Sequence, residues 1–359
     1  MLSTSLARFG RTPRGVLLAT ALVVAGCAGG SGSPAPATDA AAPSEAAAPS
    51  ANEEPLEIAY LSFAVANSYD APMLAAAQAA AQNNNAKLTV FDAGLDPSKQ
   101  ATQLQDAIGS GKYDAIITQP LNGAGLVKGV QDAIAADIAV GNIDQILGAD
   151  QTTAEAQVEG LSANVAFVPS TLGRKIGELV VKACEDKAAN PCNVGYIWSV
   201  KEAALDTTLR KAFDEVIAAH PEIKVVADDG VSFYTVAGGL KAAQDMLVAH
   251  PDLTVITGAD QAISGALTAV TDQGLAEQIN LVGYGGGATA LQDIKAGTRF
   301  GTVMQMPATE GRLGVEQLIE AIRTGTPAPG VDPLDSLPEG GVVTSENVDT
   351  FLPLAEWPG

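Results

Sequence analysis

Few residues in this chain have the type and spacing that catalysis or metal binding would require. The sequence contains only two histidines, His220 and His250, and each is followed by proline at the predicted end of a helix. Because proline cannot continue a helix, we interpret both histidines as residues that help to end helices. No histidine is then left for a general base or a histidine-rich metal site. We expect neither a catalytic residue nor a bound metal.

Two of the three cysteines, Cys184 and Cys192, flank a short polar link between a predicted helix and a predicted strand. Cysteines in an exported chain most often form disulfides, and we predict that these two are bonded to each other. The alternative is a reactive thiol pair. Their spacing does not favour it, because the motif is not Cys-x-x-Cys and no histidine accompanies it.

A glycine-rich turn over Gly283–Ala288 matches the loose dinucleotide-binding fingerprint, since it follows a predicted strand and opens a predicted helix. The next strand does not end in an acidic residue that would hold a ribose, so we expect no cofactor. The sequence also has no Gly-Lys-Ser/Thr phosphate loop and no Gly-x-Ser-x-Gly motif. An enzyme is the weaker hypothesis. A cell-surface hydrolase would need two converging acids, for which Asp144 and Asp260 are the candidates.

The first part of the chain has the layout of a bacterial export leader. Arg8, Arg11 and Arg14 precede the apolar run Val16–Val24, which is too short to span a bilayer, and small residues then lead to Cys27. Residues 24–27 resemble a lipobox, so we predict a signal peptide over 1–26 and lipidation of Cys27. An ordinary leader with an incidental cysteine is the alternative.

The segment 27–55 consists almost entirely of Ala, Gly, Ser, Pro, Thr and acidic residues. That composition cannot bury enough apolar surface to offset the entropy of ordering, so we expect a disordered tether. The formal net charge of the chain is −21, which argues against a nucleic-acid binder because such proteins need a basic face. We predict an extracytoplasmic protein anchored by its lipid to the outer face of the cell membrane.

From Leu56 onward, short apolar strands alternate with amphipathic helices, which is typical of βαβ units with parallel sheets. Strands are predicted over 57–62, 87–91, 115–118, 138–141, 165–168, 193–198, 224–227, 254–257, 280–284 and 301–305. Helices are predicted between them, for example over 72–83, 99–110, 171–187, 205–219 and 237–249. Ligands of open α/β sheets bind beyond the carboxyl ends of strands, so residues that directly follow strands are the candidates for a site.

Several stretches of this body, in their order and spacing, resemble the type I periplasmic binding proteins, specifically the ribose-binding-like branch that serves sugar ABC importers. These stretches are Ala66–Met73, Leu88–Ala93, Pro97–Asp106, Ile138–Asp144, Ala249–Asp260 and Thr302–Gln305. The resemblance covers Leu56 to Val343. It implies two doubly wound parallel-sheet lobes joined by a three-segment hinge, with an N-terminal lobe of 56–167 and 306–338 and a C-terminal lobe of 168–305 and 339–359.

The resemblance also implies which residues contact the solute. Its ligand positions fall on Asn67, Tyr69, Asp70, Asp144, Gln145, Tyr234 and Gln305, with Asp260 or its neighbour Ala259 close by. Aromatic rings from Tyr69, Tyr234 and Trp198 would cover the C–H face of a sugar. The carboxylates and amides would bind its hydroxyl groups, which a site with matched polar partners discriminates strongly.

Three positions depart from the pattern of that branch. Asp70 stands where an aromatic residue is common, Leu209 stands beside Arg210 where an arginine is expected, and Gly285 replaces a carboxylate. A ribose site is therefore not intact. The changes disfavour an anionic sugar phosphate and leave a neutral sugar, a polyol and a cationic solute open.

The function that the resemblance implies is capture of a sugar or sugar-like solute by a monomer that closes on it and delivers it to the permease of an ABC importer. A sensor that presents its solute to a membrane receptor is the rival within the binding class. A transcriptional repressor of the same fold is not expected, because an export leader precedes the body.

Overall fold

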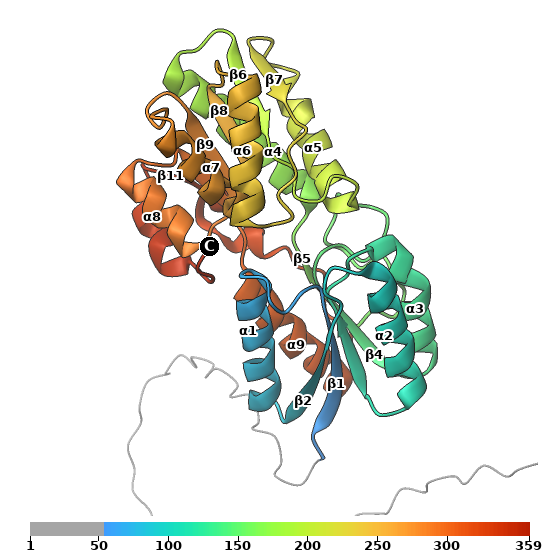
Figure 1. The fold of residues 1–359 in the computed structure, drawn as a ribbon. Helices are drawn as coiled ribbons and strands as arrows, with labels where there is room; N and C mark the ends of the chain where they lie inside the picture. The colour runs from blue at the N-terminus through green and yellow to red at the C-terminus, as the bar shows by residue number, and fades with distance from the viewer. Residues whose placement is uncertain (1–53) are drawn as a thin grey trace, which may run out of the picture. The chain divides into compact units, whose positions relative to one another are not determined.

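The computed structural model describes residues 54–359. The predicted signal peptide, Cys27 and all but the last two residues of the predicted tether lie outside the described residues. Residues 54–359 form two α/β lobes, each built on its own sheet (Figure 1). No helix within these residues is long and apolar enough to cross a membrane.

The first sheet contains five parallel strands in the order β2-β1-β3-β4-β5. Its central strands carry apolar residues on both faces, as expected for strands that helices cover on both sides. The strands are β1 (Leu56–Ser62), β2 (Ala86–Asp92), β3 (Ala115–Thr118), β4 (Ala139–Asp144) and β5 (Ala163–Ala166).

Helices cover both faces of the first sheet, because neighbouring residues of a strand point to opposite faces. Tyr60 and Ile117 pack with α1 and α9, whereas Leu61 and Ile116 pack with α2 and α3. These helices are α1 (Asp70–Asn83), α2 (Pro97–Ser110), α3 (Gly123–Ala135) and α9 (Pro307–Thr324).

The second sheet has the order β11-β10-β9-β8-β6-β7, in which β11 alone is antiparallel to its neighbour. Its strands are β6 (Cys192–Tyr196), β7 (Ile223–Ala227), β8 (Val255–Ala259), β9 (Asn280–Gly285), β10 (Gly301–Met304) and β11 (Val342–Thr344).

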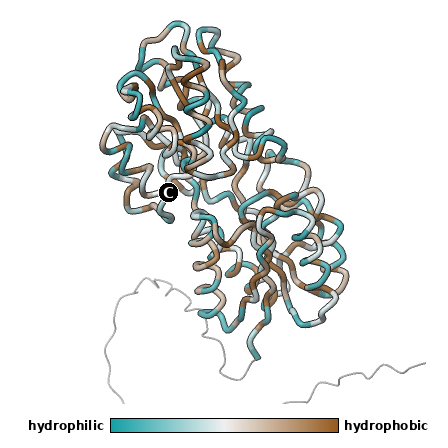
Figure 2. The backbone as a smooth tube through the Cα atoms, in the orientation of Figure 1, coloured by the Kyte–Doolittle hydropathy of each residue, from teal (hydrophilic) through white to brown (hydrophobic). Residues whose placement is uncertain are grey.

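The helices of the second lobe also lie on both faces of their sheet. Tyr196 and Val282 belong to a core with α4, α5 and α8, whereas Ile256 and Leu281 pack with α6 and α7. Figure 2 shows hydrophobic stretches along the strands and hydrophilic ones on the outer helix turns. The helices are α4 (Pro169–Lys187), α5 (Ala204–Ile217), α6 (Val236–Ala249), α7 (Asp260–Asp272) and α8 (Ala288–Ala296).

Within residues 54–359 the chain crosses between the lobes three times, which gives the expected three-segment hinge. The first crossing joins β5 to α4, and the second joins β10 to α9. The third follows α9, where Val331 pairs with Val165 and the Asp332 carboxylate accepts a hydrogen bond from the Val168 N–H at 3.0 Å. Leu334 then packs in the core of the second lobe, ahead of the predicted limit at 338.

Residues 356–358 contact both lobes. The Thr309 N–H of α9 donates to the Glu356 carboxylate at 2.8 Å. On the other side, the N–H groups of Ala288 and Thr289 in α8 donate to the carbonyls of Trp357 and Pro358, each at 2.9 Å. The segment that follows α10 (Val348–Phe351) and the short 3₁₀ turn Leu352–Leu354 therefore joins α9 to α8.

The predicted elements agree with the structure, and their differences have local causes. Each of the ten predicted strands overlaps one of β1–β10, whereas β11 was not predicted because it is only three residues long. α5 ends at Ile217, ahead of His220, and His250 is the C-cap residue of α6. The predicted disulfide between Cys184 and Cys192 is present.

Candidate functional site

The described residues enclose a cavity that both lobes line. Its space is about 480 Å³, part of it open solvent. Residues that end or directly follow strands of both sheets supply much of its wall, in agreement with the general position of ligand sites in α/β folds. The lining residues are Phe63, Asn67, Tyr69, Asp70, Asp144, Gln145, Phe167, Leu205, Tyr234, Ala259, Gln261, Tyr284, Gly285, Gln305 and Trp357.

The first lobe contributes most of the polar wall. Asn67 lies in the loop after β1, and its side-chain oxygen accepts a hydrogen bond from the Tyr69 N–H at 2.8 Å. This bond fixes the turn that leads into α1, whose first residue is Asp70. Asp144 ends β4 with a positive φ of 67°, and Gln145 follows it.

The second lobe contributes residues from helix starts and strand ends. Tyr234 precedes Thr235, whose side chain caps α6 by accepting a hydrogen bond from the Gly238 N–H. Tyr284 and Gly285 end β9, and Gln305 directly follows β10. The position of each residue is therefore set by the strand or helix cap beside it.

Gln119 links the two carboxyl groups of the first-lobe wall. Its side-chain nitrogen donates to Asp70 Oδ1 and, at 3.0 Å, to Asp144 Oδ2. Its side-chain oxygen accepts from the Phe63 N–H at 3.0 Å, which orients the amide. Gln100 donates to the Gln119 carbonyl at 2.7 Å and holds the backbone in place.

Burial has the largest effect on the pKa values of Asp70 and Asp144. It raises the pKa of Asp70 well above its ordinary value, and the negative charge of Asp144 raises it further. Burial also raises the pKa of Asp144 to about 7, against the lowering effect of hydrogen bonds from Gln119 and Gln145. Two neighbouring carboxyls that share one amide donor cannot both ionise easily without a positive charge nearby.

Two further buried acids lie behind tyrosines of the wall, one in each lobe. The Tyr69 hydroxyl donates to Glu310 Oε2 at 3.3 Å, and the Tyr234 hydroxyl donates to Asp206 Oδ2 at 3.2 Å. Burial raises the pKa of Glu310 well above its usual range and that of Asp206 to about 6. The other Glu310 oxygen is buried and has no hydrogen-bond partner among the described residues.

Residues near the end of the sequence complete the cavity. The Trp357 indole N–H donates to the Gly285 carbonyl at 2.9 Å, and its ring meets Tyr69 edge-on with centroids 5.5 Å apart. A β carbon at position 285 would lie 2.7 Å from the Trp357 ring. A glycine is therefore required at 285 for this tryptophan to line the cavity.

The comparisons with known proteins agree with this architecture. Residues 58–326 match a family model described as a periplasmic binding protein domain. The chain belongs to the periplasmic binding protein family. It is 28% identical over 237 residues to the ribose import binding protein of Bacillus subtilis, covering 66% of this chain and 72% of that protein.

A second relative of this periplasmic binding protein is the D-allose-binding periplasmic protein of Escherichia coli. The two are 27% identical over 254 residues, which are 68% of this chain and 75% of that protein. Among solved structures, a galactofuranose binding protein superposes with a TM-score of 0.72 at 19% identity. That match covers 83% of this chain and 98% of the other, and it supports the type I fold.

Two of the predicted ligand residues do not line the cavity of this periplasmic binding protein. Trp198 is buried within the second lobe, where its indole N–H donates to the Asp228 carbonyl at 2.8 Å. Its ring packs against Tyr196, and the Arg210 guanidinium lies 5.4 Å from the ring centroid. These contacts make Trp198 part of the lobe interior, and it is not among the residues that line the cavity.

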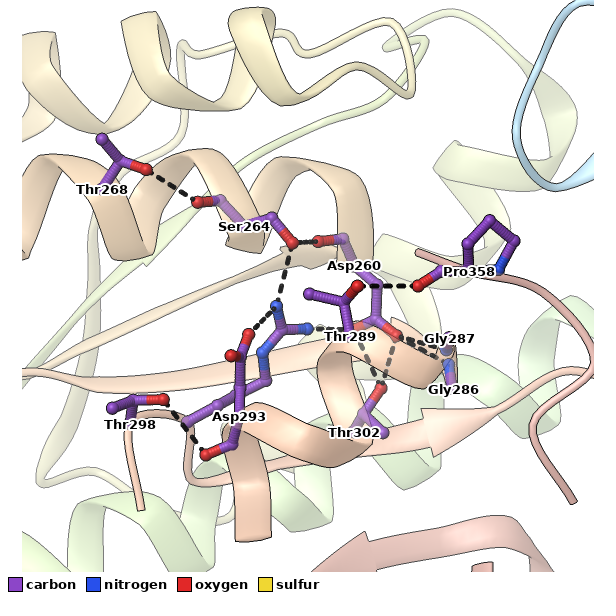
Figure 3. Close-up of polar contacts among 11 residues, drawn as sticks. Asp260, Ser264, Thr268, Gly286, Gly287, Thr289, Asp293, Thr298, Thr302 and Pro358 are labelled. Carbon is purple, nitrogen blue, oxygen red and sulfur yellow. Dashed lines mark hydrogen bonds and ion pairs between the residues drawn. The ribbon is translucent and has the colours of Figure 1, made fainter. Parts of the chain in front are cut away.

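Asp260 is the second residue, and it is enclosed by partners of its own lobe (Figure 3). Arg299 forms an ion pair with it at 2.7 Å, Thr302 donates to it at 3.0 Å, and the Gly286 N–H donates at 2.6 Å. Its carboxylate ties α7 to β10 and to the turn after β9. The Asp260 carboxylate is therefore occupied by partners of the second lobe, whereas the hydrolase hypothesis would require it to act together with Asp144.

The remaining predicted residues line one wall or another of the cavity, and the structure adds several that sequence reasoning missed. Phe63 directly follows β1, so the strand-end rule would have found it, whereas Gln261 lies one residue further from its strand, after Asp260. Trp357 has no such signal, since it follows no strand. The missed lining residues are Phe63, Phe167, Leu205, Gln261, Tyr284 and Trp357.

The cavity wall contains no Lys, Arg or His. Arg210 and Arg299 are engaged elsewhere in ion pairs with acids of the second lobe. Among the described residues, no group of three or more His, Cys, Asp or Glu side chains is arranged to hold a metal ion. What the wall offers is carboxyl and amide groups for hydrogen bonding, with aromatic rings between them.

Proposed function

We propose that this periplasmic binding protein captures a sugar or sugar-like small molecule between its two lobes and delivers it to an ABC importer. The single observation that carries the proposal is one cavity lined by polar groups and aromatic rings from both lobes. The names of the two sequence relatives, which bind ribose and allose, support the same class of solute.

The chemistry of the wall suits a polyhydroxylated molecule. Asn67, Gln145 and Gln305 each offer an amide that can both donate to and accept from a hydroxyl group. Tyr69 and Tyr234 offer ring faces for the C–H side of a sugar. A solute that lacks one of the matching hydroxyls would leave a buried polar group without a partner, which is the basis of discrimination.

The proposed mechanism is a population shift between open and closed lobes. A solute that touches both lobes only when they are closed stabilises the closed state by its differential affinity. The importer would then recognise the closed form. The three crossing segments are the natural hinge for this motion, because they are the backbone links between the lobes within residues 54–359.

The proposal also includes the setting of the protein. We propose that Cys27 carries a lipid, that residues 27–55 act as a tether, and that the body works as a monomer outside the cytoplasm, next to the importer permease. Release of the protein from membranes by a Cys27→Ser substitution tests the anchor.

The test of solute binding is a thermal-shift screen of residues 54–359 against pentoses, hexoses and polyols. A solute at 100 times its dissociation constant stabilises a folded protein by about 2.7 kcal/mol. We expect a rise in Tm with at least one of them, and its loss in Asp144→Ala but not in Asp272→Ala, a substitution of an exposed residue at the end of α7. The trap mechanism fails if scattering gives the same radius of gyration with and without a solute that binds.

A further inference from the structure

The two acids of the cavity wall, Asp70 and Asp144, have no positively charged partner among the residues that line the cavity. Asp70 and Asp144 are each only 4% exposed, and both line the cavity. None of the cavity-lining residues is Lys, Arg or His. A buried carboxylate is normally paired with a cation or held by several donors. These two acids have no cation beside them among the lining residues.

Asp70 also has fewer hydrogen-bond donors than a buried carboxylate needs. Among residues 54–359 it accepts one, from Gln119 to Oδ1, and Oδ2 has no partner. The Gln119 amide must also serve Asp144, so its two N–H groups are both used. A donor for Asp70 Oδ2 must therefore come from whatever occupies the cavity, whereas Asp144 also receives a hydrogen bond from the Gln145 side chain.

A neutral sugar supplies hydroxyl donors but no charge. Two carboxyls that share one amide donor repel each other when both are ionised, and a neutral solute leaves that repulsion in place. A protonated amine supplies three N–H donors and a positive charge at the same point. Burial raises the pKa of Asp70 and Asp144 in the protein without solute, and a bound cation would reverse this effect.

The rest of the cavity wall also suits a solute that carries a positive charge. Six aromatic side chains line the cavity, and ring faces attract cations. The formal net charge of the chain is −21, which favours the approach of a cation from solution. The aromatic lining residues are Phe63, Tyr69, Phe167, Tyr234, Tyr284 and Trp357.

We propose that the solute carries a protonated amine beside its hydroxyl groups, as an amino sugar or an amino polyol does, and that Asp70 and Asp144 bind the ammonium group. This inference rests on the proposed function as a solute-binding protein. It assigns the ammonium subsite to the first-lobe wall and leaves Gln305 and Tyr234 of the opposite lobe for the hydroxyl-bearing part.

The experiment is titration calorimetry at pH 7 with matched pairs of solutes that differ only in the amine. The pairs are D-glucosamine with D-glucose, 1-amino-1-deoxy-D-glucitol with D-glucitol, and an inosamine with myo-inositol. We expect at least one amine to bind tenfold or more tightly than its neutral parent. Its N-acetyl derivative, which keeps the nitrogen and loses the charge, should bind as weakly as the parent.

Substitutions of Asp70 test whether this residue causes the preference for amines. Asp70→Asn keeps an acceptor for Gln119 and removes the charge, so we expect amine affinity to fall at least tenfold. Asp70→Glu should retain the preference for the amine, and the exposed control Asp272→Asn should leave it unchanged. Equal thermal stability of the two Asp70 variants would exclude misfolding as the cause.

The outcomes separate this inference from the proposed function. If neutral parents bind as tightly as the amines or more tightly, the amine inference is overturned and solute binding stands. If Asp70→Asn leaves the amine preference intact, the assignment to Asp70 is overturned. If no member of any pair binds, the amine inference is overturned and the result also counts against the proposed function.

Discussion

The Trp357 indole occupies the space that a side chain at position 285 would need, and its N–H donates to the Gly285 carbonyl at 2.9 Å. The family resemblance expects a carboxylate at position 285. A side chain at position 285 and Trp357 in its present place exclude each other. On this side the cavity wall is therefore formed by an aromatic ring from the segment that follows α10.

This relationship predicts that position 285 does not accept a side chain. In Gly285→Ala the new β carbon would lie 2.7 Å from the Trp357 ring, at a φ of 132°. Overpacking of this kind costs about 1–3 kcal/mol of unfolding free energy. Gly274→Ala is the matched control, because Gly274 also has a positive φ but has nothing within 4 Å of the added carbon. Denaturant unfolding should show the larger loss in Gly285→Ala, which carries both the clash and a φ less accessible than the 69° of Gly274, and equal losses would contradict the prediction.

Trp357 itself should contribute to both stability and solute binding. Its side chain is buried, and removing a buried tryptophan costs about 3–5 kcal/mol. We expect Trp357→Ala to lower the denaturant midpoint and to weaken solute affinity, as measured by unfolding and calorimetry. Trp357→Phe keeps a ring and loses the hydrogen bond to Gly285, so it should lose only about 1 kcal/mol. Wild-type stability in Trp357→Ala would show that the segment after α10 is dispensable.

The acids of the cavity predict a stability that falls as pH rises. A carboxyl whose pKa is higher in the folded protein than in the unfolded chain binds more protons when folded between those two values. For Asp144 that window runs from its ordinary pKa of 3.8 to about 7. Its destabilising effect is absent below the window and complete above it. Thermal unfolding without solute should therefore show a higher Tm at pH 5 than at pH 7.5.

The share of Asp144 in this pH dependence can be isolated. Its charged neighbours Asp70 and Glu310, and Asp206 in the other lobe, also have raised pKa values and contribute in the same direction. Asp144→Asn should therefore reduce the slope of unfolding free energy against pH between about 4 and 7 without abolishing it. A slope equal to that of the wild type would contradict the raised pKa of Asp144.

Asp260 and Asp144 should respond differently to substitution. Arg299→Met leaves Asp260 buried without its cation, and breaking a buried ion pair costs about 3–5 kcal/mol. Asp260→Asn combined with Arg299→Met should recover part of that loss. Calorimetry with a bound solute should show a larger loss of affinity in Asp144→Asn than in Asp260→Asn. A larger loss of affinity in Asp260→Asn would indicate that Asp260 contacts the solute.

The sequence predicted the strand and helix order well because each element has a local signal. Parallel strands such as β3 are continuous apolar runs, and helices such as α2 begin at an N-cap residue followed by proline. β11 lacks such a signal, since three residues cannot show an alternating pattern and its pairing with β10 is a long-range contact. The limits of each lobe also depend on long-range contacts. Leu334, for example, packs in the core of the second lobe although the sequence placed it in the first.

Cavity residues could be predicted from the sequence where they lie at or after the end of a strand. They could not be predicted where long-range packing decides whether a side chain reaches the cavity. Asn67, Asp144 and Gln305 follow or end strands, and the structure places all three in the cavity wall. Asp260 also follows a strand, but Arg299 and Thr302 enclose it, and neither partner was visible as such in the sequence. Trp357 reaches the wall only because residues 356–358 bind α8 and α9.

That bridging segment matters for anyone who tags or labels this protein. Gly359 packs beside Thr289 and Gly287, next to the tryptophan that lines the cavity. A fluorescent protein or affinity handle joined after Gly359 would therefore start beside the cavity wall and could disturb the contacts of residues 356–358 with α8 and α9. Attachment ahead of Leu56 starts instead at the amino end of β1, at the opposite edge of the first sheet from the carboxyl ends that supply the cavity wall.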